Sequence, residues 1–220
     1  MIIPKPVHLV RSPGVFRLSS TSAIAASGAG VEVARLLQSY VDLPLAAAGD
    51  IVLEVAGEGE AYSLSVTASS VRLRGSVAGL RHAVQSLRQL ISGSSIPLVE
   101  IRDEPRFGWR GAMIDVARHF LPITYLRRLV DQIALYKLNV LHLHLTDDQG
   151  WRMPISRYPE LTAVGGHRAE SMVGPAGSTT YDGIPHGGCY TKDELRSLVS
   201  YAAARGVTVV PEIEMPGHAR

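Results

Sequence analysis

Short stretches of alternating apolar and polar residues dominate the first hundred residues of the chain. Over 61–67, Tyr62, Leu64 and Val66 share one face, while serines and a threonine occupy the other, as in a half-buried strand. Residues 51–55 and 71–74 also predict strands, and the short connection after 61–67 predicts a hairpin. Apolar positions at helical spacing predict helices over 31–41 and 77–91. We therefore expect residues 1–103 to form a small α+β domain.

A charged segment that contains a proline, 101–107, is the predicted linker to a second domain over 104–220. Beyond it the pattern changes to strand, helix, strand, helix and strand, over 109–116, 123–137, 140–145, 191–205 and 207–214. Thr191 and Glu194 fit a capping box for the second helix. We expect that helix to bury Leu195, Leu198, Val199 and Ala202. Titratable residues of the first domain do not converge, so we expect it to have a structural role.

Strands that alternate with helices predict parallel pairing through right-handed crossovers. This pattern fits two α/β folds, an open doubly wound sheet and a (β/α)8 barrel. Polar residues follow all three strands, and barrel enzymes carry their chemistry at the carboxyl ends of strands. No glycine-rich phosphate loop opens a helix, which counts against a nucleotide-binding open sheet. We predict the first three βα repeats of a (β/α)8 TIM barrel, because a whole barrel needs about 250 residues.

The middle strand of this second region carries two histidines on one face, His142 and His144. Such a pair can bind a metal ion if other strands supply further ligands. The two rings can equally fill the interior layers of a barrel as hydrogen-bonded side chains. We favour this second interpretation and expect no metal.

The other strand ends carry an arginine and several carboxylates. Arg118 follows Asp115 by three residues, which predicts a bend, and its guanidinium can bind polar ligand groups or pair with a carboxylate. The remaining candidates are carboxylates and one histidine: Asp147, Asp148, Glu212, Glu214 and His218. The two glutamates share one strand face, so they can act as an acid and base pair, orient the histidine or pair with the arginine.

Composition narrows the range of partners. The chain has 22 basic and 20 acidic residues and a formal net charge of +2, so we expect neither nucleic acid nor a membrane as partner. Cys189 is the single cysteine, which allows no intrachain disulfide. The amino terminus lacks a basic stretch followed by an apolar one, and no apolar run approaches the roughly 20 residues of a membrane span. We expect a cytoplasmic protein, unless the natural start lies elsewhere and adds a leader for secretion.

Three long motifs surround the predicted strands. They are WRGAMIDVARHFLP over 109–122, YKLNVLHLHLTDDQGWR over 136–152 and VPEIEMPGH over 210–218. In residues, order and separation they resemble glycoside hydrolase family 20, the β-N-acetylhexosaminidases. Residues 1–103 resemble, less specifically, the small α+β domain that precedes the barrel in that family. The resemblance implies removal of terminal β-linked N-acetylglucosamine or N-acetylgalactosamine with retention, the substrate's own acetamido oxygen acting as nucleophile.

The resemblance also implies roles for four residues. Arg118 resembles the arginine that hydrogen-bonds sugar hydroxyls, and Asp147 and His218 resemble the relay that orients the catalytic glutamate. Glu214 stands where some members have aspartate, and we expect it to contribute to substrate binding. The family's catalytic Asp-Glu pair follows the fourth strand in a His-x-Gly-Gly-Asp-Glu motif, which this sequence does not contain. We therefore expect a chain truncated before that pair and inactive alone, with no cofactor.

Two other functions stay open at this point. The chain could be a noncatalytic sugar-binding fragment, or it could be a metal-dependent barrel amidohydrolase that uses His142 and His144. The substrates that the family resemblance implies are oligosaccharides or glycoconjugates that end in an N-acetylhexosamine.

Overall fold

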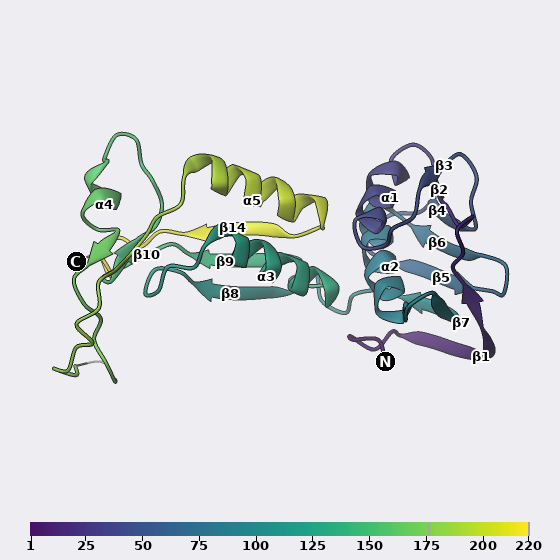
Figure 1. The fold of residues 1–220 in the computed structure, drawn as a ribbon, viewed down its shortest axis with the longest axis horizontal. Coiled ribbons are helices and arrows are strands. Elements are labelled where there is room, and N and C mark those ends of the chain that lie inside the picture. Colours follow the sequence, from purple (N-terminus) through teal and green to yellow (C-terminus); the bar gives the residue numbers. More distant parts are fainter. Residues whose placement is uncertain (176, 220) are drawn as a thin grey trace. The chain divides into compact units, whose positions relative to one another are not determined.

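The computed structural model describes residues 1–175 and 177–219, which form an α/β chain with two compact units. The first unit comprises residues 1–110, 132–138 and 204–206. The second comprises residues 111–131, 139–175, 177–203 and 207–219 of the described part of the chain. Figure 1 gives the labels of the helices and strands in both units.

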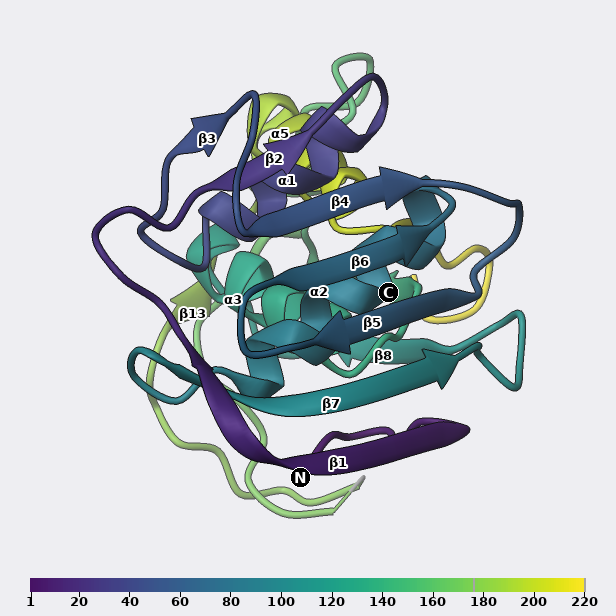
Figure 2. The ribbon, with the colours of Figure 1, turned by 90° about the vertical axis from the view of Figure 1, so that its right-hand side faces the viewer.

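A seven-stranded mixed sheet forms the centre of the first unit (Figure 2). Its strand order is β1-β7-β5-β6-β4-β2-β3. The bounds are β1 (His8–Arg17), β2 (Ile24–Ala26), β3 (Leu45–Ala46), β4 (Ile51–Val55), β5 (Tyr62–Val66), β6 (Val71–Gly75) and β7 (Ser95–Asp103). The helices α1 (Gly30–Gln38) and α2 (Val77–Leu90) cover one face of this sheet. Leu64 and Leu73 face each other in register and are fully buried, so the apolar alternation builds the core.

Most elements predicted for this region are confirmed. β5 and β6 pair as the expected hairpin, and Ser76 caps α2 by accepting the backbone N–H of Gly79 at 3.1 Å. The linker predicted over 101–107 is wrong at its start, because β7 continues through residue 103. Ile101 is fully buried there and pairs with Leu64 of β5. Residues 104–107 belong to no helix or strand, so only this later part of the predicted linker agrees with the structure.

Titratable side chains also converge in the first unit, contrary to our prediction. Lys137 is buried, and its Nζ donates to Asp103 Oδ2 at 2.9 Å and to the Tyr62 hydroxyl at 2.8 Å. Burial lowers the pKa of Lys137, although the hydrogen bond to Asp103 opposes this shift. A second group of hydrogen-bonded side chains comprises Glu60, His82 and Arg110. These residues are far apart in the sequence, so a hydrophobic pattern does not reveal that they meet.

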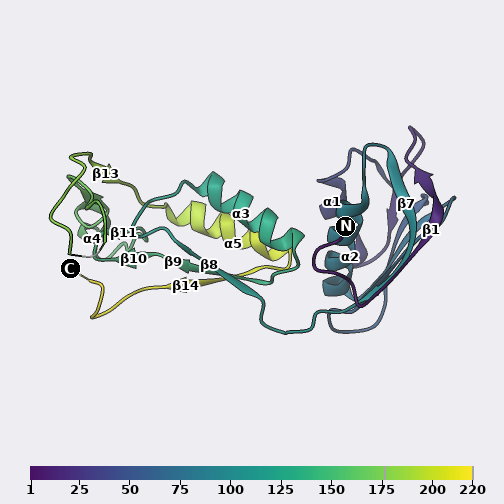
Figure 3. The same cartoon turned by 90° about the horizontal axis from the view of Figure 1, so that it is seen from below.

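A three-stranded parallel sheet forms the second unit, with the order β14-β9-β8. Its strands are β8 (Gly111–Asp115), β9 (Val140–His144) and β14 (Thr208–Glu212), and its long helices are α3 (Ile123–Leu135) and α5 (Lys192–Ala204). Successive strands are neighbours, and Figure 3 shows α3 and α5 on the same face of the sheet. Both crossovers therefore have the same hand, as expected for parallel strands joined by helices.

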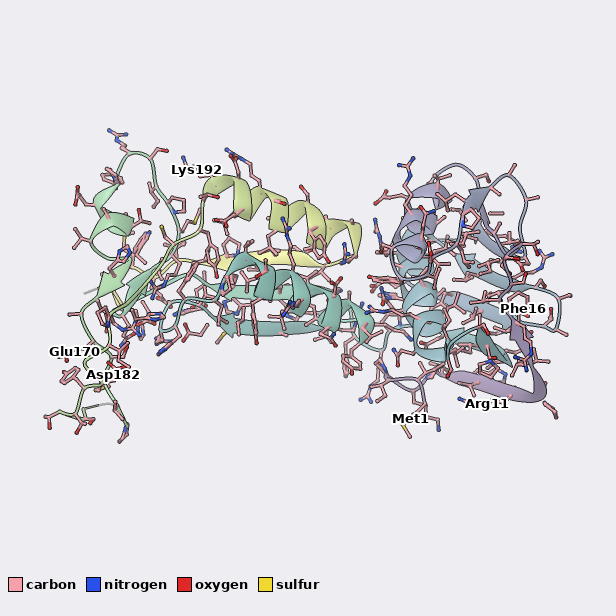
Figure 4. The ribbon with its side chains drawn as sticks, in the orientation of Figure 1. Met1, Arg11, Phe16, Glu170, Asp182 and Lys192 are labelled. Carbon is pink, nitrogen blue, oxygen red and sulfur yellow. The ribbon has the colours of Figure 1, made fainter. Side chains whose placement is uncertain are left out.

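The segment between β9 and α5 contains only short elements. They are β10 (Thr146–Asp147), β11 (Gly150–Trp151), α4 (Glu160–Ala163), β12 (His167–Arg168) and β13 (His186–Gly187). Asp182 stabilises this segment by accepting the backbone N–H groups of Ser171 at 2.8 Å and Ile184 at 2.9 Å. Figure 4 labels Asp182 and the nearby Glu170 on this segment.

The capping box of α5 is confirmed, but of the four residues predicted to be buried, Leu195 is only half-buried and Val199 is exposed. Thr191 Oγ1 accepts the backbone N–H of Glu194 at 3.1 Å, and the glutamate carboxylate accepts the backbone N–H of Thr191 at 2.7 Å. Leu198 and Ala202 are buried, whereas Val199 is 51% exposed. Val199 lies about 100° around the helix from Leu198, so it leaves the stripe that faces the sheet. No helix among residues 1–175 and 177–219 is long and apolar enough to cross a membrane.

Candidate active site

The carboxyl ends of β8, β9 and β14 bring three titratable residues into one row. Asp115 pairs in register with His144, and His144 pairs in register with Glu212. Parallel strands with no register shift place their last residues side by side, so this row follows directly from the sheet. The row lies at the carboxyl edge of the sheet, in contact with Arg118 and Asp147 of the candidate site.

The chain bends directly after β8, as predicted from the spacing of Asp115 and Arg118. Asp115 Oδ1 accepts the backbone N–H groups of Ala117 and Arg118, both at 3.0 Å. Its Oδ2 lies 2.7 Å from Arg118 Nη1. Burial would raise the pKa of Asp115, but the hydrogen bonds from Arg118 outweigh this effect and lower it. This turn directs the arginine back over the row of strand ends.

Asp147 is the most deeply buried carboxylate of the site, with 1% of its side chain exposed. Its Oδ2 lies 2.6 Å from Arg118 Nη2 and 2.8 Å from His144 Nε2. Its Oδ1 lies 3.2 Å from His218 Nδ1 and accepts the backbone N–H of Asp148 at 2.7 Å. Burial acts to raise the pKa of Asp147, yet the hydrogen bonds from His144, the Asp148 backbone and His218 and the charge of Arg118 lower it. Asp147 is therefore an ionised carboxylate with both oxygens engaged.

Glu212 joins the two histidines of β9. Its Oε2 lies 2.9 Å from His144 Nδ1 and 2.5 Å from His142 Nε2. The bond with His144 is the main cause of the lowered pKa of Glu212. Burial lowers the pKa of His144, but its bonds with Glu212 and Asp147 outweigh burial and raise it. These contacts agree with the interpretation of both rings as hydrogen-bonded side chains.

Two predicted site residues follow β14. The backbone N–H of Glu214 donates to Thr146 Oγ1 at 2.8 Å, which ties this segment to β10. His218 has a φ of 53°, in the left-handed region that non-glycine residues rarely adopt, and half of its side chain is exposed. Its ring reaches Asp147, so the structure brings together Arg118, Asp147 and His218, whereas Asp148 is exposed beside them.

A cavity of ≈ 1280 Å³ opens beside these residues. Ligand pockets for small molecules commonly measure about 300–1,000 Å³, so there is room for an oligosaccharide. Arg118, Asp147 and Glu214 line it together with residues of the segment between β9 and α5. The aromatic and apolar part of this lining includes Trp151, Ile155, Tyr158, Leu161, Met172 and Tyr181. Aromatic faces beside charged donors suit the alternating apolar and hydroxyl faces of a sugar.

Sequence reasoning missed Arg152, which organises the base of the cavity. Its guanidinium is fully buried and donates to the backbone carbonyl oxygens of Val116, Ala117, Gly166 and Gly188, at 2.7 to 3.0 Å. Burial lowers the pKa of Arg152. Gly150 leaves room for this guanidinium, since a Cβ there would collide with it, but this close approach is visible only in the folded chain. Arg152 thus connects two segments, at Gly166 and Gly188, to the turn at residues 116–117 that precedes Arg118.

Two groups of possible metal ligands occur among the described residues. The donor atoms of His144, Glu212 and Glu214 lie within 4.8 Å of one another, as do those of Asp147, Asp148 and His218. Metal ligation requires a free nitrogen lone pair on the histidine. Both nitrogens of His144 face carboxylate oxygens, and His218 Nδ1 faces Asp147, so hydrogen bonding accounts for these nitrogens.

Comparison with known families matches almost the whole chain. The model of the glycosyl hydrolase family 20 catalytic domain matches residues 107–220, and the model of domain 2 of that family matches residues 1–104. The chain is 40% identical to a β-hexosaminidase of Vibrio furnissii over its whole length, and 49% identical over 73% of its length to one of Akkermansia muciniphila. It covers 38% and 32% of those two proteins, so it spans about a third of their length.

Solved structures agree with this match. The exo-β-N-acetylglucosaminidase of Vibrio harveyi in complex with N-acetylglucosamine has a TM-score of 0.85 and 33% identity, over 99% of this chain and 36% of that one. A Streptomyces plicatus β-hexosaminidase mutant in complex with N-acetylglucosamine has a TM-score of 0.86 and 35% identity, over 99% and 46%. These likenesses support an α/β fold with an N-terminal domain and part of a TIM barrel, and they confirm the resemblance read from the motifs. The chain belongs to glycosyl hydrolase family 20.

Proposed function

We propose that this chain supplies the sugar-holding half of a β-N-acetylhexosaminidase active site. The observation that carries the proposal is Asp147, a buried carboxylate clamped by Arg118 and His218 at the edge of a large cavity. The reaction is hydrolysis of a terminal β-linked N-acetylglucosamine or N-acetylgalactosamine. It proceeds with retention, and the acetamido oxygen of the substrate attacks the sugar carbon.

Arg118 is the proposed sugar-binding residue. Its side chain is 44% exposed and lines the cavity, while Asp115 and Asp147 fix its orientation from below. A guanidinium held in this way presents N–H donors in fixed directions, which suits bidentate binding of vicinal hydroxyls. Glu214 lines the same cavity and supplies an acceptor for a sugar hydroxyl.

Asp147 and His218 form the proposed relay to the general acid. An ionised Asp147 accepts a hydrogen bond from His218 Nδ1–H, and in this tautomer the lone pair of His218 Nε2 is free to accept from a further group. In family 20 that group is the catalytic glutamate of the His-x-Gly-Gly-Asp-Glu motif, which the 220 residues do not contain. The 220-residue chain therefore hydrolyses no glycoside by itself under this proposal.

The proposed fold of the second region is the first three βα repeats of a (β/α)8 barrel, over residues 104–220, after a separate domain over 1–103. Sequential strand order and helices on one face of the sheet support a barrel, since an open doubly wound sheet carries helices on both faces. The cytoplasmic location and the lack of nucleic-acid or membrane partners remain predictions.

The gene sequence around these 220 codons tests the proposal most directly. A His-x-Gly-Gly-Asp-Glu motif encoded downstream supports it, and the complete product should then release nitrophenol from a nitrophenyl N-acetyl-β-glucosaminide. A stop codon directly after codon 220 would contradict it, as would robust turnover by the 220-residue chain.

A noncatalytic sugar-binding protein is the second candidate, and the cavity beside the exposed Arg118 favours it. Calorimetric titration of the 220-residue chain with N-acetylglucosamine separates the two functions. Saturable binding that disappears in Arg118→Ala, with no catalytic pair encoded downstream, would identify a binder. A stoichiometric divalent ion in the purified protein would instead favour the metal-dependent amidohydrolase.

A further inference from the structure

His144 occupies an unusual position between two carboxylates. Its Nδ1 lies 2.9 Å from Glu212 Oε2, and its Nε2 lies 2.8 Å from Asp147 Oδ2. A carboxylate can only accept, and a neutral imidazole has one N–H to donate. Both contacts can be hydrogen bonds to ionised carboxylates only if His144 carries a proton on each nitrogen. The ring is buried, so no bulk water replaces either contact.

The local fold fixes both partners of the ring. The in-register pairing of β9 with β14 makes Glu212 the lateral neighbour of His144. The antiparallel pair of β10 and β11 then brings Asp147 back over the same ring, three residues after His144. Asp147 is buried, and the pairing of β14 with β9 holds the backbone of Glu212 next to His144.

The surrounding charges agree with a cationic ring. The charged and titratable groups around it come from β8 and its following turn, β9, β10, and β14 and its following segment: Asp115, Arg118, His142, Asp147, Glu212, Glu214 and His218. Four of these groups are carboxylates, and Arg118 is the one permanent cation among them. An imidazolium in the middle of the row reduces the repulsion between the carboxylates.

Asp147 divides its two oxygens between different partners. Oδ2 contacts the side chains of Arg118 and His144. Oδ1 contacts the ring of His218 and accepts the backbone N–H of Asp148. Holding Oδ2 from two sides fixes the plane of the carboxylate. That plane in turn determines the direction in which Oδ1 meets the ring of His218.

We propose that His144 is a positioning residue of this site, donating from both ring nitrogens to Glu212 and Asp147 so that Asp147 Oδ1 is held toward His218. The hydrogen-bonded series then runs from Glu212 through His144 and Asp147 to His218. It extends the proposed pair of Asp147 and His218 by two residues on the side away from His218. The catalytic significance of this chain rests on the proposed function, but the protonation and the hydrogen bonds of His144 do not.

Nuclear magnetic resonance of the imidazole nitrogens in the isotope-labelled 220-residue chain tests the inference, with signals assigned by their loss in His144→Gln. The expected result is two protonated nitrogens on His144 at neutral pH, each with a scalar or nuclear Overhauser connection to a bound proton. One unprotonated nitrogen on His144 at neutral pH would overturn the proposal. The protonation itself is measured in the unaltered chain, and the variant serves only to assign the signals.

Two variants and a control then test the hydrogen bonds. Glu212→Gln should lower the midpoint of the His144 titration by about 1–3 pH units, because it removes an adjacent negative charge. His144→Gln should move the ring signals of His218, because Asp147 loses one of the donors that orient it. His8→Gln, at an exposed histidine of the first unit, should leave both sets of signals in place. An unchanged His144 midpoint in Glu212→Gln would also overturn the proposal.

The outcome is independent of glycosidase activity. A doubly protonated His144 in a protein whose complete gene encodes no catalytic pair would leave this inference intact and reject the proposed function. A complete, active hexosaminidase with a neutral His144 would do the reverse.

Discussion

Each unit buries a carboxylate against nitrogen donors, but the two units differ in how far those donors are exposed to solvent. In the first unit, Asp103 and Lys137 are both sealed, with 10% and 5% of their side chains exposed. In the second unit, Asp147 is 1% exposed, while its partners Arg118 and His218 are 44% and 54% exposed and reach solvent. A sealed pair can only stabilise the fold. A buried carboxylate that holds exposed nitrogen donors in fixed directions can also bind and orient a ligand.

The contrast between the Asp103–Lys137 pair and the Asp147 site predicts that Asp147→Asn has the largest effect on kcat of the complete enzyme. The change keeps the shape but removes the charge that orients His218, so we expect kcat to fall by about 10⁴-fold, as for other histidine-orienting aspartates. Steady-state kinetics with a nitrophenyl glycoside measures it. Asp193→Asn, on the exposed side of α5, is the matched control and should change kcat less than twofold. A tenfold loss or less in Asp147→Asn would mean that the buried anion serves stability alone.

Lys137→Met should act on stability and leave the sugar site unchanged. It leaves Asp103 buried without its cation, and breaking a buried pair in this way lowers the free energy of unfolding by about 3–5 kcal/mol. Urea denaturation followed by tryptophan fluorescence and circular dichroism measures this change. The exposed Lys5→Met serves as control. If Lys137→Met instead lowered kcat at unchanged stability, the distinction between the sealed and the open cluster would fail.

Arg118→Ala should weaken sugar binding by about 10- to 100-fold, since hydrogen bonds to a charged group contribute about 1.5–3 kcal/mol. The effect should appear mainly in KM of the complete enzyme, because the guanidinium contacts the sugar in the ground state. Arg128→Ala, at an exposed position of α3, should leave KM unchanged. An effect confined to the melting temperature would reduce Arg118 to a structural partner of Asp115 and Asp147.

Acid should destabilise the second unit through Asp147, which is the smallest of the expected effects. The pKa of Asp147 is lower in the folded state than its unfolded value of about 3.9, so its contribution to stability is present above that pH. It is lost as the pH falls below about 4 and through the folded pKa. Comparing the pH dependence of unfolding in wild type and Asp147→Asn isolates the contribution. Parallel curves below pH 4 would contradict the lowered pKa.

Local patterns in the sequence were sufficient for most helices and strands, because one side of each element packs against its neighbours. Tyr62, Leu64 and Val66 alternate into the core, and the capping box of Thr191 and Glu194 is local by nature. Val199 shows where the same reasoning failed. Its spacing fits a wide apolar stripe, but α5 covers the sheet with a narrower one.

The sequence by itself determined the family and the candidates Arg118, Asp147, Glu214 and His218, because the motifs place characteristic residues at strand ends. Only the tertiary structure decided which of their atoms meet. The registers of β8, β9 and β14 set His144 beside Asp115 and Glu212, and the turn after β9 returns Asp147 to the same ring. Arg152 and Lys137 became visible only in the folded chain, since their hydrogen-bond partners come from distant segments. Side-chain periodicity reports which face of an element is buried, whereas hydrogen bonds between elements depend on how the backbone closes.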